Sequence, residues 1–184
     1  LIAIDVANAM KAVDYATGYG QEAVDIAEAG YNNANTANTS ADTAITHTNT
    51  LKITEAETSY GQATAAFGNI GTTVDAGGTG RTQENLALIS KNAAIAALSS
   101  IASSTNINNA LALVTSITRI SYNAASRTSA INSLNSTLAS ITDATLRNNL
   151  ATKLVDMYIK WKQAGIYLTD ANTLKGTADT KIST

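Results

Sequence analysis

His47 is the only histidine of the chain, and it limits the chemistry that one copy can perform. Metal sites built from two or three histidines cannot form within one chain, and neither can a di-iron site with its Glu-x-x-His pairs. The serines occur in no GxSxG motif, so a serine nucleophile has no sharp turn to present it. His47 lies between two threonines, and we interpret it as a solvated residue on a helix surface.

Two groups of carboxylates are close enough in sequence to consider general acid–base catalysis. Glu22, Asp25 and Glu28 are spaced by three and lie near one face of a helix, while Glu55 and Glu57 flank an alanine. General acid–base chemistry needs a carboxyl group with a shifted pKa near a reacting group. These carboxylates have helical spacing within polar stretches, which favours a solvated acidic helix face instead. We therefore predict no catalytic residue among them.

Two further motifs are candidates for binding sites. The glycine-rich residues 68–82 contain neither GxGxxG nor GxxxxGK[ST], so they do not match a phosphate-binding loop. In Lys160-Trp161-Lys162 the indole could stack on a nucleotide base. However, Trp161 is in helical register with Met157 and Ala164, which predicts a core residue whose flanking lysines point away. The sequence therefore predicts no enzyme, no cofactor and no metal.

Composition narrows the class of function further. The net charge is −2 and only 14% of the residues are charged, which gives no electrostatic basis for binding nucleic acid. Proline and cysteine are absent, so helices can run without interruption and no disulfide forms. No run of eighteen apolar residues is present to span a membrane. The 92–118 stretch comes nearest, because it contains no charged residue.

Small or apolar residues recur at alternating spacings of three and four along the first third of the chain. This heptad pattern predicts a helix from about Ile2 to Phe67 with a tendency to supercoil. The stripe comprises Val6, Ala9, Val13, Ala16, Gly20, Ala23, Ala27, Gly30, Ala34, Ala37, Ala41, Ala44, Thr48 and Leu51.

The residues between the stripe positions are mostly Asn, Thr and Asp, which are mediocre helix formers. Such a helix is stable only when something packs along it. Alanine and glycine bury little area, but they let two backbones approach closely. We therefore predict an assembly seam, a row of small residues in tight helix–helix contact, at Ala23, Ala27, Gly30, Ala34, Ala37, Ala41 and Ala44. Tyrosine is favoured at interfaces, and the candidate anchors between subunits are Tyr15, Tyr19, Tyr31 and Tyr60; a plain surface role is the alternative.

The pattern of apolar residues in the rest of the chain predicts an ordinary helical bundle. We expect a second helix to begin at Arg81 or Thr82 and a turn to follow over residues 104–109. A third helix carries an Ala/Leu/Ile stripe over 110–141, and Asp143 caps a fourth helix. The predicted parts are a long helix or shaft over 1–67, a Gly/Thr-rich loop over 68–82, a three-helix bundle over 83–176 and a frayed tail over 177–184. The fold class is all-α: a long N-terminal heptad helix plus a C-terminal antiparallel helical bundle. Whether the long helix folds back on its own chain is left open.

The 16–51 segment resembles the Ala/Asn/Thr-rich coiled-coil shafts of phage tail fibres and similar extracellular appendages. The matching positions are the seam residues Ala23, Ala27, Gly30, Ala34, Ala37, Ala41 and Ala44. The resemblance implies a structural subunit of a fibre, filament or virion appendage, which assembles with copies of itself and is extracellular or virion-associated.

Two alternatives follow from other features. The uncharged 92–118 stretch has apolar arms on each side of a polar turn, which would suit a membrane-active protein that inserts a helical hairpin. Two amphipathic helices of the bundle are the explanation that we prefer. The threonines at 36, 39, 43, 46 and 50 share one helix face, which would suit adsorption to ice or another regular surface.

Overall fold

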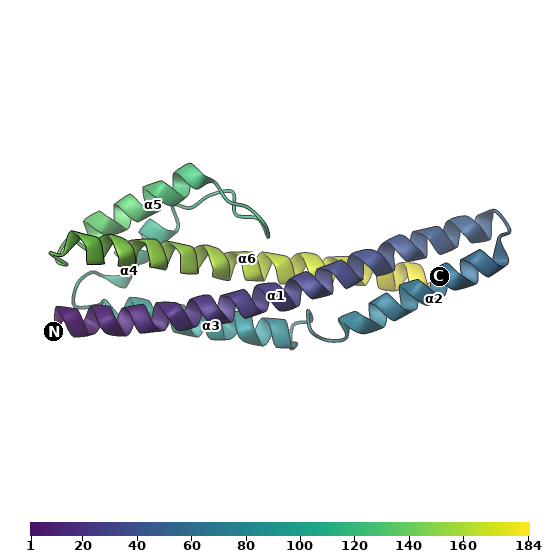
Figure 1. Ribbon diagram of the computed structural model, residues 1–184, viewed down its shortest axis with the longest axis horizontal. Helices are drawn as coiled ribbons and strands as arrows, with labels where there is room; N and C mark the ends of the chain where they lie inside the picture. Colours follow the sequence, from purple (N-terminus) through teal and green to yellow (C-terminus); the bar gives the residue numbers. More distant parts are fainter. The chain divides into compact units, whose positions relative to one another are not determined.

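The computed structural model describes residues 1–184 and contains six α-helices and no β-strand (Figure 1). The all-α prediction is thus confirmed, and so is the packing of a long N-terminal helix against a C-terminal helix. The helices are α1 (Ile2–Asn49), α2 (Ile53–Ile70), α3 (Thr79–Ala97), α4 (Ser104–Leu111), α5 (Ala124–Thr137) and α6 (Ala144–Ser183).

The chain forms two compact units, and α1 and α6 each contribute to both. Unit 1 comprises Leu1–Glu22 and Gln83–Ala164, and unit 2 comprises Ala23–Thr82 and Gly165–Thr184. Each unit therefore joins an early segment of the sequence with a late one.

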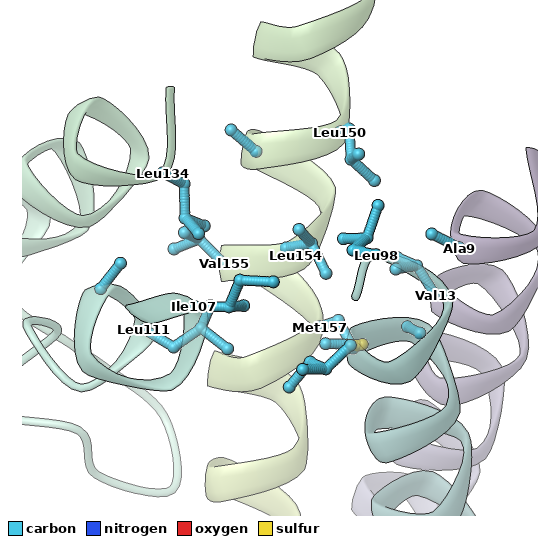
Figure 2. Close-up of a cluster of buried hydrophobic side chains, with 14 of the residues drawn as sticks. Ala9, Val13, Leu98, Ile107, Leu111, Leu134, Leu150, Leu154, Val155 and Met157 are labelled. Atoms are coloured by element: carbon cyan, nitrogen blue, oxygen red, sulfur yellow. The ribbon is translucent and has the colours of Figure 1, made fainter. Parts of the chain in front are cut away.

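Unit 1 is built around the first half of α6. Figure 2 shows Val155 directed towards Ile107, Leu111 and Leu134 of α4 and α5, while Leu154 faces the side of α1 and α3. Because α6 is covered on two sides, its apolar stripe is broad. Branched and other large side chains dominate this cluster, which is the arrangement of an ordinary helical core.

Unit 2 has a core of mostly small residues. Ala27 and Ala34 of α1 pack with Ile70 and Val74 and with Tyr167, Leu168 and Ala171 of α6. Further along, Ala37 packs with Ala66 of α2 and Ala178 of α6. The order of these contacts shows that α2 runs antiparallel to α1. The alanine stripe of α1 is therefore covered by α2 and α6 of the same chain.

The heptad stripe predicted for α1 is buried at every position from Val6 to Ala44. Thr48 and Leu51 are exposed, and the prediction of one helix reaching Phe67 is wrong. The chain turns over residues 50–52, where Leu51 has a φ of 61° and the Lys52 amide donates to the His47 carbonyl. The turn brings the small-residue stripe of α2 onto α1, and that burial favours two antiparallel helices over one extended helix.

The predicted turn over 104–109 is instead helical and forms most of α4, and of the helix predicted over 110–141 the main helical part is α5. Residues 112–123 between α4 and α5 are not helical, and Leu113 and Ile120 of the predicted stripe are exposed. Val114, Thr115, Ile117, Thr118 and Ile120 are β-branched and have low helix propensity. The Asn123 side chain accepts from the Ser126 amide and so begins α5, while Ser103, just before the predicted turn, caps α4.

The ends of the other helices differ from the prediction by several residues. Asp143 does cap α6, because its Oδ1 accepts from the Leu146 amide. The predicted frayed tail is instead helical to Ser183, since Ala178 is fully buried and Lys181 pairs with Asp42 at 2.7 Å. The glycine-rich loop is shorter than predicted and spans residues 71–78.

Candidate functional site

The residues predicted as an assembly seam lie inside unit 2. All are buried, from 0% exposure at Ala23 to 8% at Ala44. At Gly30 an added Cβ would fall on the Val74 side chain, so the absence of a side chain is what allows the close approach. The seam is thus a tight helix–helix contact, as its residue types indicate, and within this chain its partners are α2 and α6.

The four tyrosines singled out from the sequence have different surroundings. Tyr31 packs edge-on against Tyr167, with ring centroids 5.6 Å apart, and Tyr19 on α1 is partly buried. Tyr15 and Tyr60 are 55% and 51% exposed, respectively. The last two therefore present much of their ring to solvent, Tyr15 from unit 1 and Tyr60 from unit 2.

The outer surface of the α1–α2 hairpin in unit 2 is unusually poor in charge. Neither residues 29–41 of α1 nor residues 58–74, which include most of α2, contain Asp, Glu, Lys or Arg. We call the exposed side chains of these two stretches the uncharged face; they are chiefly Asn32, Asn35, Thr36, Thr39, Thr58, Tyr60, Gln62, Thr64, Ala65, Asn69 and Thr72. The Asp42–Lys181 and Asp75–Lys175 ion pairs lie just beyond its ends in the sequence.

An apolar groove of about 610 Å³ lies near the turn between α1 and α2. Ala44 and Ile45 of α1, Ile53 and Tyr60 of α2, and Ile182 of α6 contribute to its lining. Ile45 and Ile53 are 42% and 57% exposed, respectively. Exposed apolar side chains that gather in this way are typical of interaction surfaces.

The residues considered for catalysis do not come together. Glu22, Asp25, Glu28, Glu55 and Glu57 are all exposed on helix surfaces. His47 is half-buried in the last turn of α1, so it is less solvated than predicted. No three His, Asp or Glu side chains of the chain are placed to hold a metal ion.

The structure brings together one group that the sequence did not predict. Lys91 of α3 and Lys162 of α6 place their ammonium groups 4.6 and 5.0 Å from the centre of the Trp161 ring. Lys162 also lies 5.8 Å from the Tyr158 ring, so the prediction that this lysine points away from Trp161 is wrong. Trp161 itself is only partly buried and does not belong to the core cluster, contrary to the prediction. The spacing of Tyr158 and Lys162 could have revealed their contact, but the approach of Lys91 from another helix could not be read from sequence.

Electrostatics in this cluster follow from burial. Lys91 is only 8% exposed, and this burial, together with the like charge of Lys162, lowers its pKa. Burial also raises the pKa of Tyr158, because the phenolate would be poorly solvated.

The uncharged stretch considered for membrane insertion lies in unit 1. Ala94, Ile95, Leu98, Ile107 and Leu111 are all buried in the core of this unit. No helix in the chain has the length and apolar character that crossing a membrane requires.

Comparison of the chain with protein-family models, curated proteins and solved structures finds no match.

Proposed function

We propose that the protein is a structural subunit that assembles with copies of itself through the α1–α2 hairpin of unit 2. The observation that carries this proposal is the uncharged face, which is flanked by the apolar groove. Interface cores are depleted in charged residues and enriched in tyrosine. The uncharged face shares the depletion in charge, and it exposes one tyrosine, Tyr60, among its Asn, Thr and Gln side chains.

The absence of charge favours a second copy of this chain over an unrelated partner. When two copies meet through the same surface, residues near the symmetry axis face their own counterparts. A charged residue there would meet a like charge, which is unfavourable. Hydroxyls and side-chain amides both donate and accept hydrogen bonds, so they can pair with themselves. The setting we propose is a fibre, filament or virion appendage outside the cell, in line with the shaft resemblance of the 16–51 segment.

The proposal changes which residues would carry assembly. The small-residue seam already has its partners within the chain, so the surface between subunits has to be built from the exposed residues of α1 and α2. A mutational test should therefore target the uncharged face and leave the seam intact.

The test is light scattering across a wide range of protein concentration, combined with electron microscopy of the same samples. We expect the wild type to exceed the 19.0 kDa chain mass as its concentration rises. The double variant Asn32→Lys, Asn35→Lys should stay monomeric, because it brings like charges together at the contact. The lysine introduced at position 32 would follow Glu28 by one helical turn, a pairing that favours the helix and protects folding.

A matched control adds the same charges elsewhere. Asn132→Lys and Asn149→Lys are changes at exposed positions in unit 1, on α5 and α6. This control should assemble like the wild type. A wild type that is monomeric at every concentration, or two double variants that behave alike, would overturn the proposal.

A second candidate function is adsorption to a regular surface such as ice. Exposed threonines form rows on two helices of unit 2, and each hydroxyl donates to the carbonyl four residues earlier. In α1 and the turn after it these include Thr39, Thr43, Thr46 and Thr50, and in α6 and at its end they include Thr173, Thr177, Thr180 and Thr184. These bonds fix the rotamers and so the positions of the methyl groups, as a surface match requires.

Thermal hysteresis of the purified protein tests this candidate directly. Freezing-point depression should fall when Thr39 and Thr43 are replaced by lysine, because bulky charged side chains disrupt a flat contact. Absence of hysteresis in the wild type would exclude adsorption to ice.

A further inference from the structure

Lys91 is a largely buried lysine whose amine has no acidic partner. Its ammonium lies over the Trp161 ring, donates no hydrogen bond to the protein and has no carboxylate within ion-pair distance. The carboxylate nearest in sequence on α3, Glu84, is two turns away. Lys175 provides the contrast, because its partly buried ammonium pairs with Asp75 at 2.9 Å.

The charged and titratable groups around Lys91 do not compensate its charge. On α6 the neighbours are Tyr158 and Lys162, of which the second is itself cationic and lies over the same indole. The carboxylate of Asp14 on α1 pairs with Lys153 at 3.4 Å, and the stem of Lys160 on α6 packs on Gly20; Lys162 is the one charged group that acts on Lys91. The indole face stabilises a cation only weakly compared with a buried carboxylate.

An amine in such surroundings is more nucleophilic than a solvated lysine. A desolvated lysine beside another cationic group holds a larger neutral fraction at neutral pH, and the neutral form is the one that attacks carbonyl carbon. The low exposure of Lys91 restricts its reactants to small molecules.

We propose that Lys91 is a covalent modification site that reacts with small aldehydes to form a Schiff base. The lone pair of Nζ attacks the carbonyl carbon and gives a carbinolamine. The carbonyl oxygen then leaves as water with two protons, one of them from the nitrogen, and the C=N bond forms. No oxidation or reduction is involved in this step.

Competitive labelling tests the proposal on the intact chain. Limiting formaldehyde with cyanoborohydride traps the imine as a methylated amine, and mass spectrometry locates each modified lysine. At neutral pH we expect Lys91 to be labelled several-fold faster than the exposed Lys52. This advantage should disappear in urea, where burial and the neighbouring charge are lost.

Two variants separate the electrostatic cause from a general change in structure. Lys162→Gln removes the neighbouring cation and should slow labelling of Lys91 at neutral pH by about two-fold or more. Lys160→Gln removes the charge two positions before Lys162 in the sequence and should leave the labelling rate of Lys91 unchanged. Circular dichroism confirms that both variants fold. Slower labelling of Lys91 than of Lys52 in the folded wild type, or equal effects of the two variants, would overturn the proposal.

Discussion

The two units use opposite kinds of side chain to bury the same two helices. In unit 1 the stripes of α1 and α6 meet Leu98, Ile107 and Leu134, and most of the core is Leu, Ile, Val and Met. In unit 2 the same helices meet through alanines, and the larger members of the core are Ile70, Val74, Tyr167 and Leu168. One helix can therefore serve two packing modes along its length.

The difference shows where the stability of each unit originates. A buried leucine removes far more apolar area from water than an alanine methyl. Unit 1 thus depends on the area that each side chain buries. Unit 2 gains less per residue and depends on close contact between helices, in which many weak dispersion contacts add up. Removing volume should therefore damage unit 1, and adding volume should damage unit 2.

The largest effect is expected from removing volume in unit 1. Leu154 is fully buried in α6 (Figure 2). Leu154→Ala should lower the free energy of unfolding by about 3 kcal/mol, because it loses apolar burial and leaves a cavity. Urea denaturation measures this loss. Leu113→Ala, at a position that is 44% exposed, is the control and should cost less than about 1 kcal/mol; similar losses at both positions would contradict the assigned core.

Adding volume in unit 2 should produce the next largest effect. Ala34 of α1 is fully buried in the core that α2 and α6 complete, so Ala34→Leu forces these helices apart and should cost about 2 kcal/mol. The measurement is hydrogen exchange in α2, made in dilute monomer. The exposed Ala65→Leu serves as the control.

This variant also distinguishes a seam within the chain from a seam between subunits. If Ala34 packed only against another copy, the monomer would tolerate leucine and assembly alone would fail. Loss of protection in the monomer supports the packing that the structure shows. Full protection in the Ala34→Leu monomer would place the seam at a contact between copies.

The heptad stripe of α1 could be predicted because its cause is local. A spacing that alternates three and four places Val6 through Ala44 on one side of any helix. The partner of that stripe could not be predicted, because α2 and α6 offer small residues of the same kind that a second copy would offer. The pattern therefore established a close contact without establishing whether the chain folds back.

The two nonhelical segments that the sequence predicted as helix were missed for a common reason. Residues 50–52 and 112–123 contain neither glycine nor proline, which are the usual signals of a turn. Leu51 adopts a positive φ that leucine rarely takes, so packing of α2 on α1 rather than local preference determines the turn. The Lys91–Trp161 contact was missed similarly, because two helices distant in sequence create it.

A smaller effect is expected from a pair of glycines on α1. Gly18 has open space around an added Cβ, whereas at Gly30 the Cβ would fall on Val74. Gly18→Ala should stabilise the protein by about 0.5–1 kcal/mol through helix propensity. Gly30→Ala should destabilise it by about 1 kcal/mol, because the stiff valine side chain has to move. Thermal unfolding compares the two, and a gain at both positions would show that α1 and residue 74 are less close than described.

The smallest effect concerns one ion pair in each unit. Lys175 donates to both carboxylate oxygens of Asp75 and to the Gly71 carbonyl, and its side chain is 18% exposed. Arg127 forms two hydrogen bonds with Asp156 in unit 1, but its side chain is 27% exposed and that of Asp156 is 49% exposed. Solvent weakens such surface pairs, so Asp156→Asn should cost less than about 0.5 kcal/mol.

Asp75→Asn should cost more, about 1 kcal/mol, because it leaves the less exposed Lys175 ammonium without its charged partner. Measuring both variants at low and high salt completes the comparison, since screening weakens the more exposed pair more strongly. The cost of Asp75→Asn should therefore persist in salt while that of Asp156→Asn vanishes. The reverse result would mean that the exposed Arg127–Asp156 pair stabilises unit 1 more than the Lys175–Asp75 pair stabilises unit 2.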